Sequence, residues 1–152
     1  MMLDQEVIRL GLDICIALEN QEIHSGIRET AVSFCEGRYV LEEKPAMVCA
    51  GDFSCMAPEV YWGERYDGRV DVYALGLLLY ARLNEGLLPF AEAQMDEKAL
   101  RSAHLRRLEG EEIPLPKHGS TQLQSVVMKA CAYEPNDRYA DLQQMAQALR
   151  EV

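Results

Sequence analysis

Paired cysteines, long apolar runs and positive charge are scarce in this sequence, and each absence excludes a class of protein. None of its five cysteines forms a C-x-x-C pair, the spacing typical of zinc sites. The longest apolar run, Val72–Ala81, is too short to cross a bilayer, and the acidic N-terminus differs from the basic start of a secretory signal. We therefore expect a cytoplasmic protein with reduced cysteines, no bound metal and no membrane segment.

The shortage of positive charge narrows the range of partners. Lys and Arg number 15 against 25 Asp and Glu, which gives a net charge of −10. A field of that sign repels phosphate groups. We expect neither nucleic acid nor a membrane surface to be the partner.

The length and the hydrophobic content fit one globular domain over residues 1–152. The chain has 152 residues, 49% of them hydrophobic and 26% charged, and a chain of this size can fold without a metal or a disulfide. Apolar residues recur at helical spacing over residues 5–20. Residues 69–84 are apolar on all sides, which predicts a helix at the centre of the core. Three further helices, each opened by a capping residue, are predicted over residues 96–108, 120–132 and 141–151.

Between the first two helical segments the pattern changes. Residues 24–55 contain short apolar pieces separated by polar residues and glycine, which predicts short strands joined by turns, with Gly37 in a hairpin turn. A single helical turn is predicted over Met56–Tyr61. The predicted fold class is mainly α, built around one buried central helix, with a short β-hairpin region near residues 30–50.

Three motifs, in this order along the chain, resemble one family. Met56–Val60 resembles the A-P-E motif that closes the activation segment of a protein kinase. Asp71–Gly76 resembles the D-x-x-x-x-G start of the central helix in the kinase C-terminal lobe, and Cys131–Tyr139 resembles the stretch before the last kinase helix. The chain is therefore similar to the C-terminal lobe of a bacterial-type Ser/Thr protein kinase. It shows no glycine-rich loop, V-A-I-K lysine or helix-C glutamate, so the resemblance implies a C-lobe without an N-lobe.

The resemblance also implies that the catalytic groups are degenerate. The catalytic loop of the family has the sequence I-H-R-D-I-K-P-E-N-I, and Ile23–Val32 stands at this place in the chain. The catalytic aspartate has become Gly26 and the metal-binding asparagine has become Ala31. Glu43 aligns with the metal-binding aspartate of D-F-G but is longer by one methylene. We expect no phosphotransfer, no ATP or Mg²⁺ binding and no other cofactor.

Four positions of the family's structural framework are kept. Glu59 and Arg138 match a buried ion pair between the activation segment and the loop before the last helix. Asp71 matches a residue that hydrogen-bonds the catalytic-loop backbone, and His24 matches the base of a hydrophobic spine. We interpret all four as structural rather than catalytic.

Other side chains have weaker candidate roles. Cys49 and Cys55 could carry a reactive thiol. The aromatic residues after the A-P-E motif, and the arginines of the helix near Asp96, could form partner surfaces. Local packing of the aromatic residues and an ordinary solvated face for the arginines are the favoured alternatives. These aromatic residues are Tyr61, Trp62 and Tyr66, and these arginines are Arg101, Arg106 and Arg107.

The expected function is that of a pseudokinase: an inactive kinase-like C-lobe acting as a protein-interaction or regulatory module. Val32, Phe34, Val40 and Leu41 would lie on the face that an N-lobe covers, so a partner protein or a second copy is expected there. Two alternatives stay open. The chain could be part of a split or truncated Ser/Thr kinase that needs an N-lobe and catalytic groups from another chain, or a piece of a longer protein with no separate role.

Overall fold

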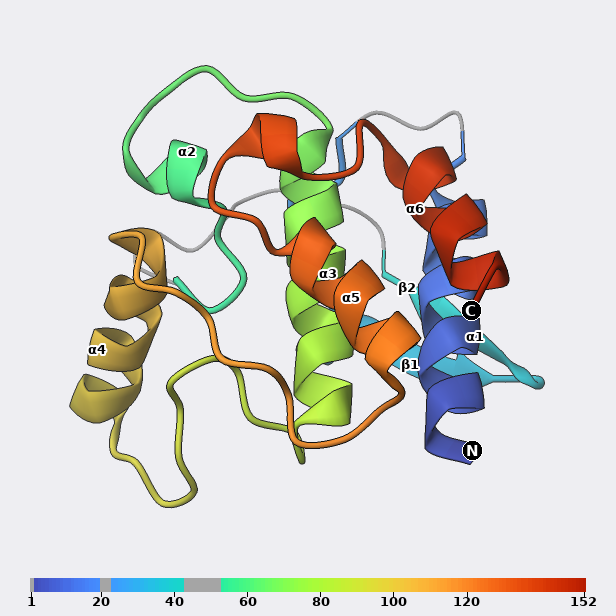
Figure 1. Ribbon diagram of the computed structural model, residues 1–152, viewed down its shortest axis with the longest axis horizontal. Coiled ribbons are helices and arrows are strands. Elements are labelled where there is room, and N and C mark those ends of the chain that lie inside the picture. Colours follow the sequence, from blue (N-terminus) through green and yellow to red (C-terminus); the bar gives the residue numbers. More distant parts are fainter. Residues whose placement is uncertain (1, 20–22, 43–52) are drawn as a thin grey trace.

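The computed structural model describes residues 2–19, 23–42 and 53–152. Six α-helices, one two-stranded antiparallel sheet and two short 3₁₀ turns are found in these ranges (Figure 1). The predicted fold class is confirmed, and the hairpin falls inside the predicted region. In chain order the elements are α1 (Met2–Ala17), η1 (Glu29–Ala31), β1 (Val32–Cys35), β2 (Arg38–Leu41), α2 (Pro58–Tyr61), α3 (Arg69–Leu83), α4 (Glu97–Leu108), α5 (Thr121–Ala130), η2 (Pro135–Asp137) and α6 (Leu142–Arg150).

Helix α3 is the centre of the core. All of its residues except Arg69 and Arg82 are buried, which agrees with its apolar sequence. Helices α1, α5 and α6 pack on it, and Figure 1 shows α4 set apart from them beyond the other side of α3. No helix in the described ranges is long and apolar enough to span a membrane.

The contact between α3 and α5 is unusually close because Gly76 has no side chain. A Cβ atom at Gly76 would lie 2.8 Å from Cβ of Ala130 and 2.9 Å from Sγ of Cys131. Two helix backbones can approach this closely only where one of them presents a glycine.

The three C-terminal helices begin at the predicted capping residues. The side chains of Asp96, Ser120 and Asp141 each accept a hydrogen bond from the backbone N–H three residues later. Such a bond satisfies one of the four N–H groups that a helix leaves unpaired at its start. The sequence therefore determines these helix starts locally.

The hairpin turns at Glu36 and Gly37, both with positive φ, as a two-residue turn requires. Strand β2 packs against α1, where the Asp13 carboxylate accepts the Tyr39 N–H at 2.9 Å. Of the four apolar side chains expected on the face that an N-lobe covers, Val32 and Leu41 are not free for a partner, because both are half-buried against the core. Phe34 and Val40 stay exposed, at 58% and 41%.

Candidate functional site

The loop at residues 24–26 is held in place by Asp71, in the first turn of α3. The buried Asp71 carboxylate accepts the N–H of His24 at 2.7 Å and that of Ser25 at 2.9 Å. Hydrogen bonds to an ionised acceptor are stronger than neutral ones, and a carboxylate near a helix N-terminus is also favoured by the helix dipole. Ser25 has a φ of 60°, a conformation that costs energy for a residue with a Cβ, and these two bonds stabilise it.

His24 joins the same loop to the end of the hairpin. Its Nδ1 accepts the Gly26 N–H at 3.1 Å, so this nitrogen carries no proton. The other nitrogen, Nε2, therefore donates to the Glu42 carbonyl oxygen, 2.6 Å away. Both ring nitrogens are used inside the fold, and the ring is buried.

Two of the three positions expected to be degenerate, Gly26 and Ala31, have no polar side chain. Gly26 and Ala31 are both buried, the second in η1. Glu43 and Cys49 lie outside the described residues. Within the ranges that the structure describes, no group of three or more His, Cys, Asp or Glu side chains could hold a metal ion.

Glu59 and Arg138 lie together as a buried bidentate ion pair. Nη1 and Nη2 of Arg138 each lie 2.8 Å from an oxygen of the Glu59 carboxylate. The same guanidinium donates to the carbonyl oxygens of Ala132 and Tyr133, at 2.7 and 3.0 Å. The pair connects α2 to the segment before α6, which lies far from it in the sequence.

Arg107 is a second buried guanidinium, and sequence analysis missed it. We expected a solvated basic stripe on α4, but Arg107 is only 1% exposed. It donates to the carbonyl oxygens of Phe53 and Met56, at 2.6 and 2.7 Å, and to the Tyr73 hydroxyl at 2.9 Å. One signal could have revealed it: Arg107 lies four residues after the buried Ala103 and therefore on the same helix face.

The other two arginines of that stripe are exposed, and each lies over an aromatic ring. The Arg101 guanidinium lies 5.1 Å from the ring centre of Phe53, and that of Arg106 lies 4.1 Å from that of Phe90. Arg106 also forms an ion pair with Glu111. Exposed contacts of this kind contribute little to stability.

Burial keeps two ionisable side chains beneath this region, Cys131 and Tyr73, neutral. Burial raises the pKa of Cys131 to about 12, and that of Tyr73 also to about 12 although Arg107 lowers it. A thiol with such a pKa is not nucleophilic at neutral pH, so Cys131 is a packing residue. The half-buried Cys55 belongs to the pocket described below.

Aromatic side chains cover the surface next to α2. Tyr61 meets both Phe53 and Trp62 edge to face, with ring centres 5.6 and 5.0 Å apart. The indole N–H of Trp62 donates to the Leu108 carbonyl oxygen at 3.0 Å, and Tyr66 is 53% exposed. The aromatic cluster therefore combines local packing with exposed ring surface.

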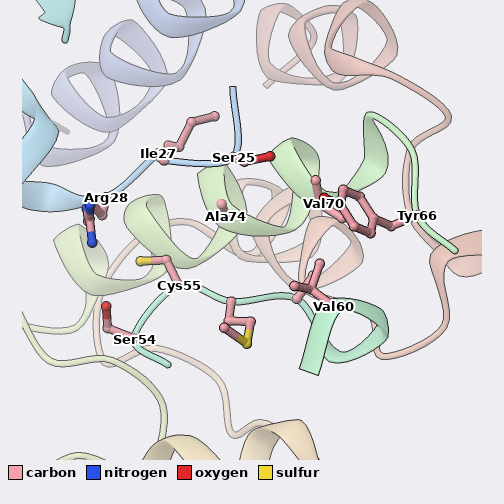
Figure 2. A pocket seen from close by; sticks show the side chains of 12 residues that line it. Ser25, Ile27, Arg28, Ser54, Cys55, Val60, Tyr66, Val70 and Ala74 are labelled. Carbon is pink, nitrogen blue, oxygen red and sulfur yellow. The ribbon is translucent and has the colours of Figure 1, made fainter. Parts of the chain in front are cut away.

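Between the loop and α2 lies a pocket of about 260 Å³. Figure 2 shows side chains of α3 along one side of it and those of segment 54–57 along another, with Arg28 and Tyr66 at opposite ends of the view. Gly26, at the position of the catalytic base in the resembled family, forms part of its lining. The described residues that line it are 25–28, 54–57, Val60, Tyr66, Val70 and Ala74.

Comparison with known proteins identifies the family. The model of the protein kinase domain matches residues 34–150, so the chain belongs to the protein kinase family. It is 34% identical over 105 residues to serine/threonine-protein kinase Pkn1 of Myxococcus xanthus, covering 69% of this chain and 15% of that protein. It is 33% identical over 127 residues to serine/threonine-protein kinase PknD of Chlamydia trachomatis serovar D, covering 80% of this chain and 13% of that protein. The chain therefore spans only a small part of these relatives.

Proposed function

We propose that this chain is a catalytically inactive kinase C-lobe that acts as a protein-interaction or regulatory module. The observation that carries the proposal is the loop at residues 24–26. Asp71 and His24 hold its backbone with three buried or half-buried hydrogen bonds, while residue 26, at the position of the catalytic base, is a glycine. The framework of the site is kept and its reactive group is absent.

Phosphoryl transfer depends on the groups that these positions lack. A carboxylate must orient the substrate hydroxyl, and metal ligands must hold the Mg²⁺ ions that neutralise the phosphates. Gly26 and Ala31 provide neither group. Removing one such electrostatic group typically slows an enzyme by a factor of about 100 to 1000, and here two positions are affected. We therefore expect neither turnover nor binding of Mg-ATP.

The charged groups that remain support an interaction role. Glu59, Arg138, Asp71 and Arg107 are all buried, and burying a charge is costly unless it is well bonded. Each of them fixes one segment to another at the candidate site and none is left to act on a substrate. A rigid surface is what this arrangement provides, and a partner protein or a second copy is the proposed ligand.

The test is thermal unfolding with and without Mg-ATP, together with a phosphotransfer assay that uses an active protein kinase as the positive control. A ligand that binds only the folded state raises the melting temperature in proportion to the logarithm of its concentration. We expect no rise and no transfer. A magnesium-dependent rise that grows with the nucleotide concentration would overturn the proposal.

A second arm addresses catalytic groups supplied by another chain. Candidate N-lobe proteins are added with Mg-ATP, and Glu43→Gln is compared with Asp67→Asn, which removes an exposed carboxylate of the Asp67–Arg69 pair. Phosphorylation that Glu43→Gln abolishes and Asp67→Asn leaves intact would identify the chain as part of a split kinase. Absence of phosphorylation with every candidate agrees with the inactive module.

A further inference from the structure

The connection between α4 and α5 is restricted in conformation by its own sequence (Figure 1). It contains Pro114 and Pro116, and a proline ring fixes its own φ at about −65°. Ile113 and Leu115 each precede a proline, which disfavours the helical region and leaves extended conformations. Residues 111–116 accordingly form neither helix nor strand. Four successive residues are therefore held close to the polyproline II conformation.

Burial along this connection repeats every three residues, as it does on a polyproline II helix that lies against a surface. Ile113 is half-buried and packs against the core, and Pro116, three residues later, is buried. Pro114 and Leu115, between them, are exposed, and so is Lys117. A polyproline II helix has three residues per turn, so residues three apart share a face. One face is therefore anchored in the protein, and the other two face solvent.

Two hydrogen bonds hold the connection in place. The Tyr80 hydroxyl donates to the Pro114 carbonyl oxygen at 2.8 Å, and the Gln124 side-chain amide donates to that of Pro116 at 3.0 Å. Tyr80 belongs to α3 and Gln124 to α5, so the connection is tied to the core of the fold. A segment that is already ordered loses less conformational entropy when it binds a partner.

The outer faces offer apolar surface and a backbone acceptor. Leu115 is 65% exposed, and the exposed Pro114 precedes it in the chain. Among the residues that the structure describes, no hydrogen bond uses the Leu115 carbonyl oxygen. Extended proline-containing segments of this kind dock in grooves lined with aromatic rings, and the Tyr O–H and Trp N–H groups of such a groove can donate to a carbonyl oxygen.

We infer that residues 112–117 are a docking segment for a partner domain whose groove is lined with tyrosine and tryptophan rings. Pro114 and Leu115 are the side chains that enter the groove. The exposed Glu112 and Lys117 end the segment with opposite charges, so they can fix the direction in which it lies there. The inference rests on the proposed function, because it names the kind of protein that the interaction module binds.

The test is a ¹⁵N–¹H titration of the full chain with a panel of isolated SH3, WW and EVH1 domains, whose grooves bind proline-containing segments through aromatic rings. We expect at least one of these domains to shift the amide signals of Ile113, Leu115 and Lys117 saturably. No shift of these signals with any domain of the panel would overturn the inference.

Substitutions at the outer face make the test specific. Pro114→Ala and Leu115→Ala should each weaken binding about tenfold, as loss of a central contact does. Both residues are exposed, and Tyr80 bonds the backbone of residue 114, so both variants should keep the fold. Ile16→Ala is the matched control, because it shortens an aliphatic residue of α1 that is 57% exposed, and it should preserve binding. Binding that both variants retain, or that Ile16→Ala weakens equally, would contradict the assignment.

This experiment and the Mg-ATP experiment can fail separately. A chain that binds a domain of the panel and also transfers phosphate retains the docking segment and loses the proposed inactivity. A chain that does neither remains an inactive module and loses the docking segment.

Discussion

Single buried charges decide how the candidate site is built. Asp71 and Arg107 bind backbone groups of neighbouring segments. Glu59 and Arg138 bind each other, and Arg138 also binds backbone carbonyl oxygens. The family resemblance identified three of these four from the sequence. The burial of Arg107 was not predicted, because an arginine side chain is normally solvated. Nothing in the local sequence reveals that backbone carbonyl oxygens of residues 53, 54 and 56 accept its hydrogen bonds.

The Glu59–Arg138 pair should contribute strongly to stability. Glu59→Gln leaves the buried Arg138 without its counter-charge, and loss of one partner of such a pair typically costs about 3–5 kcal/mol. Urea unfolding measures this loss. Asp67→Asn is the control, because Asp67 and Arg69 form an exposed pair expected to contribute about 0–1 kcal/mol. Equal, small effects of the two substitutions would show that the buried pair is not what joins α2 to the segment before α6.

Alkaline pH should destabilise the fold through its buried neutral acids. Burial raises the pKa of Cys131 from 9.0 to about 12 and that of Tyr73 from 10.0 to about 12. Because the folded protein holds these protons more tightly than the unfolded chain, the stability present below pH 9 is lost as the pH rises towards 12. Each group lowers the free energy of unfolding by up to about 1.4 kcal/mol per pH unit.

Chemical denaturation between pH 8 and 12 measures this slope. Cys131→Ala should make the dependence of the unfolding free energy on pH shallower by the contribution of about one proton. Cys35→Ala, which removes an exposed thiol, should leave it unchanged. A slope that is identical in the two variants would mean that Cys131 ionises as readily in the fold as outside it.

Among the helices and strands, the sequence predicted best those whose bounds depend on neighbouring residues along the chain. Capping residues at Asp96, Ser120 and Asp141 and the apolar run of α3 predicted these helices with nearly correct bounds. The burial of the hairpin was less predictable. Its alternation says which residues share a face, but only the packing of α1 decides that Leu41 is covered while Phe34 is not.

The close approach of α3 and α5 should make Gly76 intolerant of any side chain. Gly76→Ala places a methyl group within 3 Å of both Ala130 and Cys131, and overpacking of this kind typically costs about 1–3 kcal/mol. Gly68→Ala is the matched control: its new methyl group meets nothing within 4 Å, and its φ of −59° suits alanine. Thermal unfolding should show a loss for the first and no loss for the second. A loss at both positions would indicate a general effect of replacing glycine near α3.

Helix α4 should depend on Arg107 for its link to segment 53–56. Arg107→Met keeps the aliphatic bulk and removes all of its hydrogen bonds, each of which contributes about 1.5–3 kcal/mol when a charged group is involved. Hydrogen exchange should accelerate in segment 53–56. Arg106→Met, which removes the exposed partner of Glu111, should leave that exchange unchanged. Unchanged exchange in both variants would contradict the coupling.

For the whole molecule, hydrophobic patterning and three motifs predicted the fold class and the family, because both depend on many residues at once. The pocket was not predicted. It depends on how segments 25–28 and 54–57 are held, the first by Asp71 and the second by Arg107. Asp71 opens one of the three motifs, but Arg107 belongs to none of them.

A second copy of the chain is one proposed partner of the hairpin, and in that case the protein should form a dimer in solution. Phe34 and Val40 are both exposed but lie on opposite faces of the hairpin, because Phe34 pairs with Tyr39 and Val40 pairs with Ser33. A second copy is therefore expected on the face that carries Phe34. Light scattering over a range of concentrations should show a dimer that Phe34→Ser weakens. Leu115→Ser, at another exposed apolar residue, should not weaken it. A monomer at the highest concentration would leave a partner protein as the proposed occupant of this face.

The Asp4 side chain on α1 has a consequence for synthesis. Its carboxylate accepts the N–H of Ser120, the residue that opens α5, across 116 positions of sequence. At ribosomal rates of about 5–20 residues per second, α1 waits roughly 6 to 23 s for that partner to be made. During this interval α1 can pack only on β2 and α3, because α6, its other large partner, is made later still.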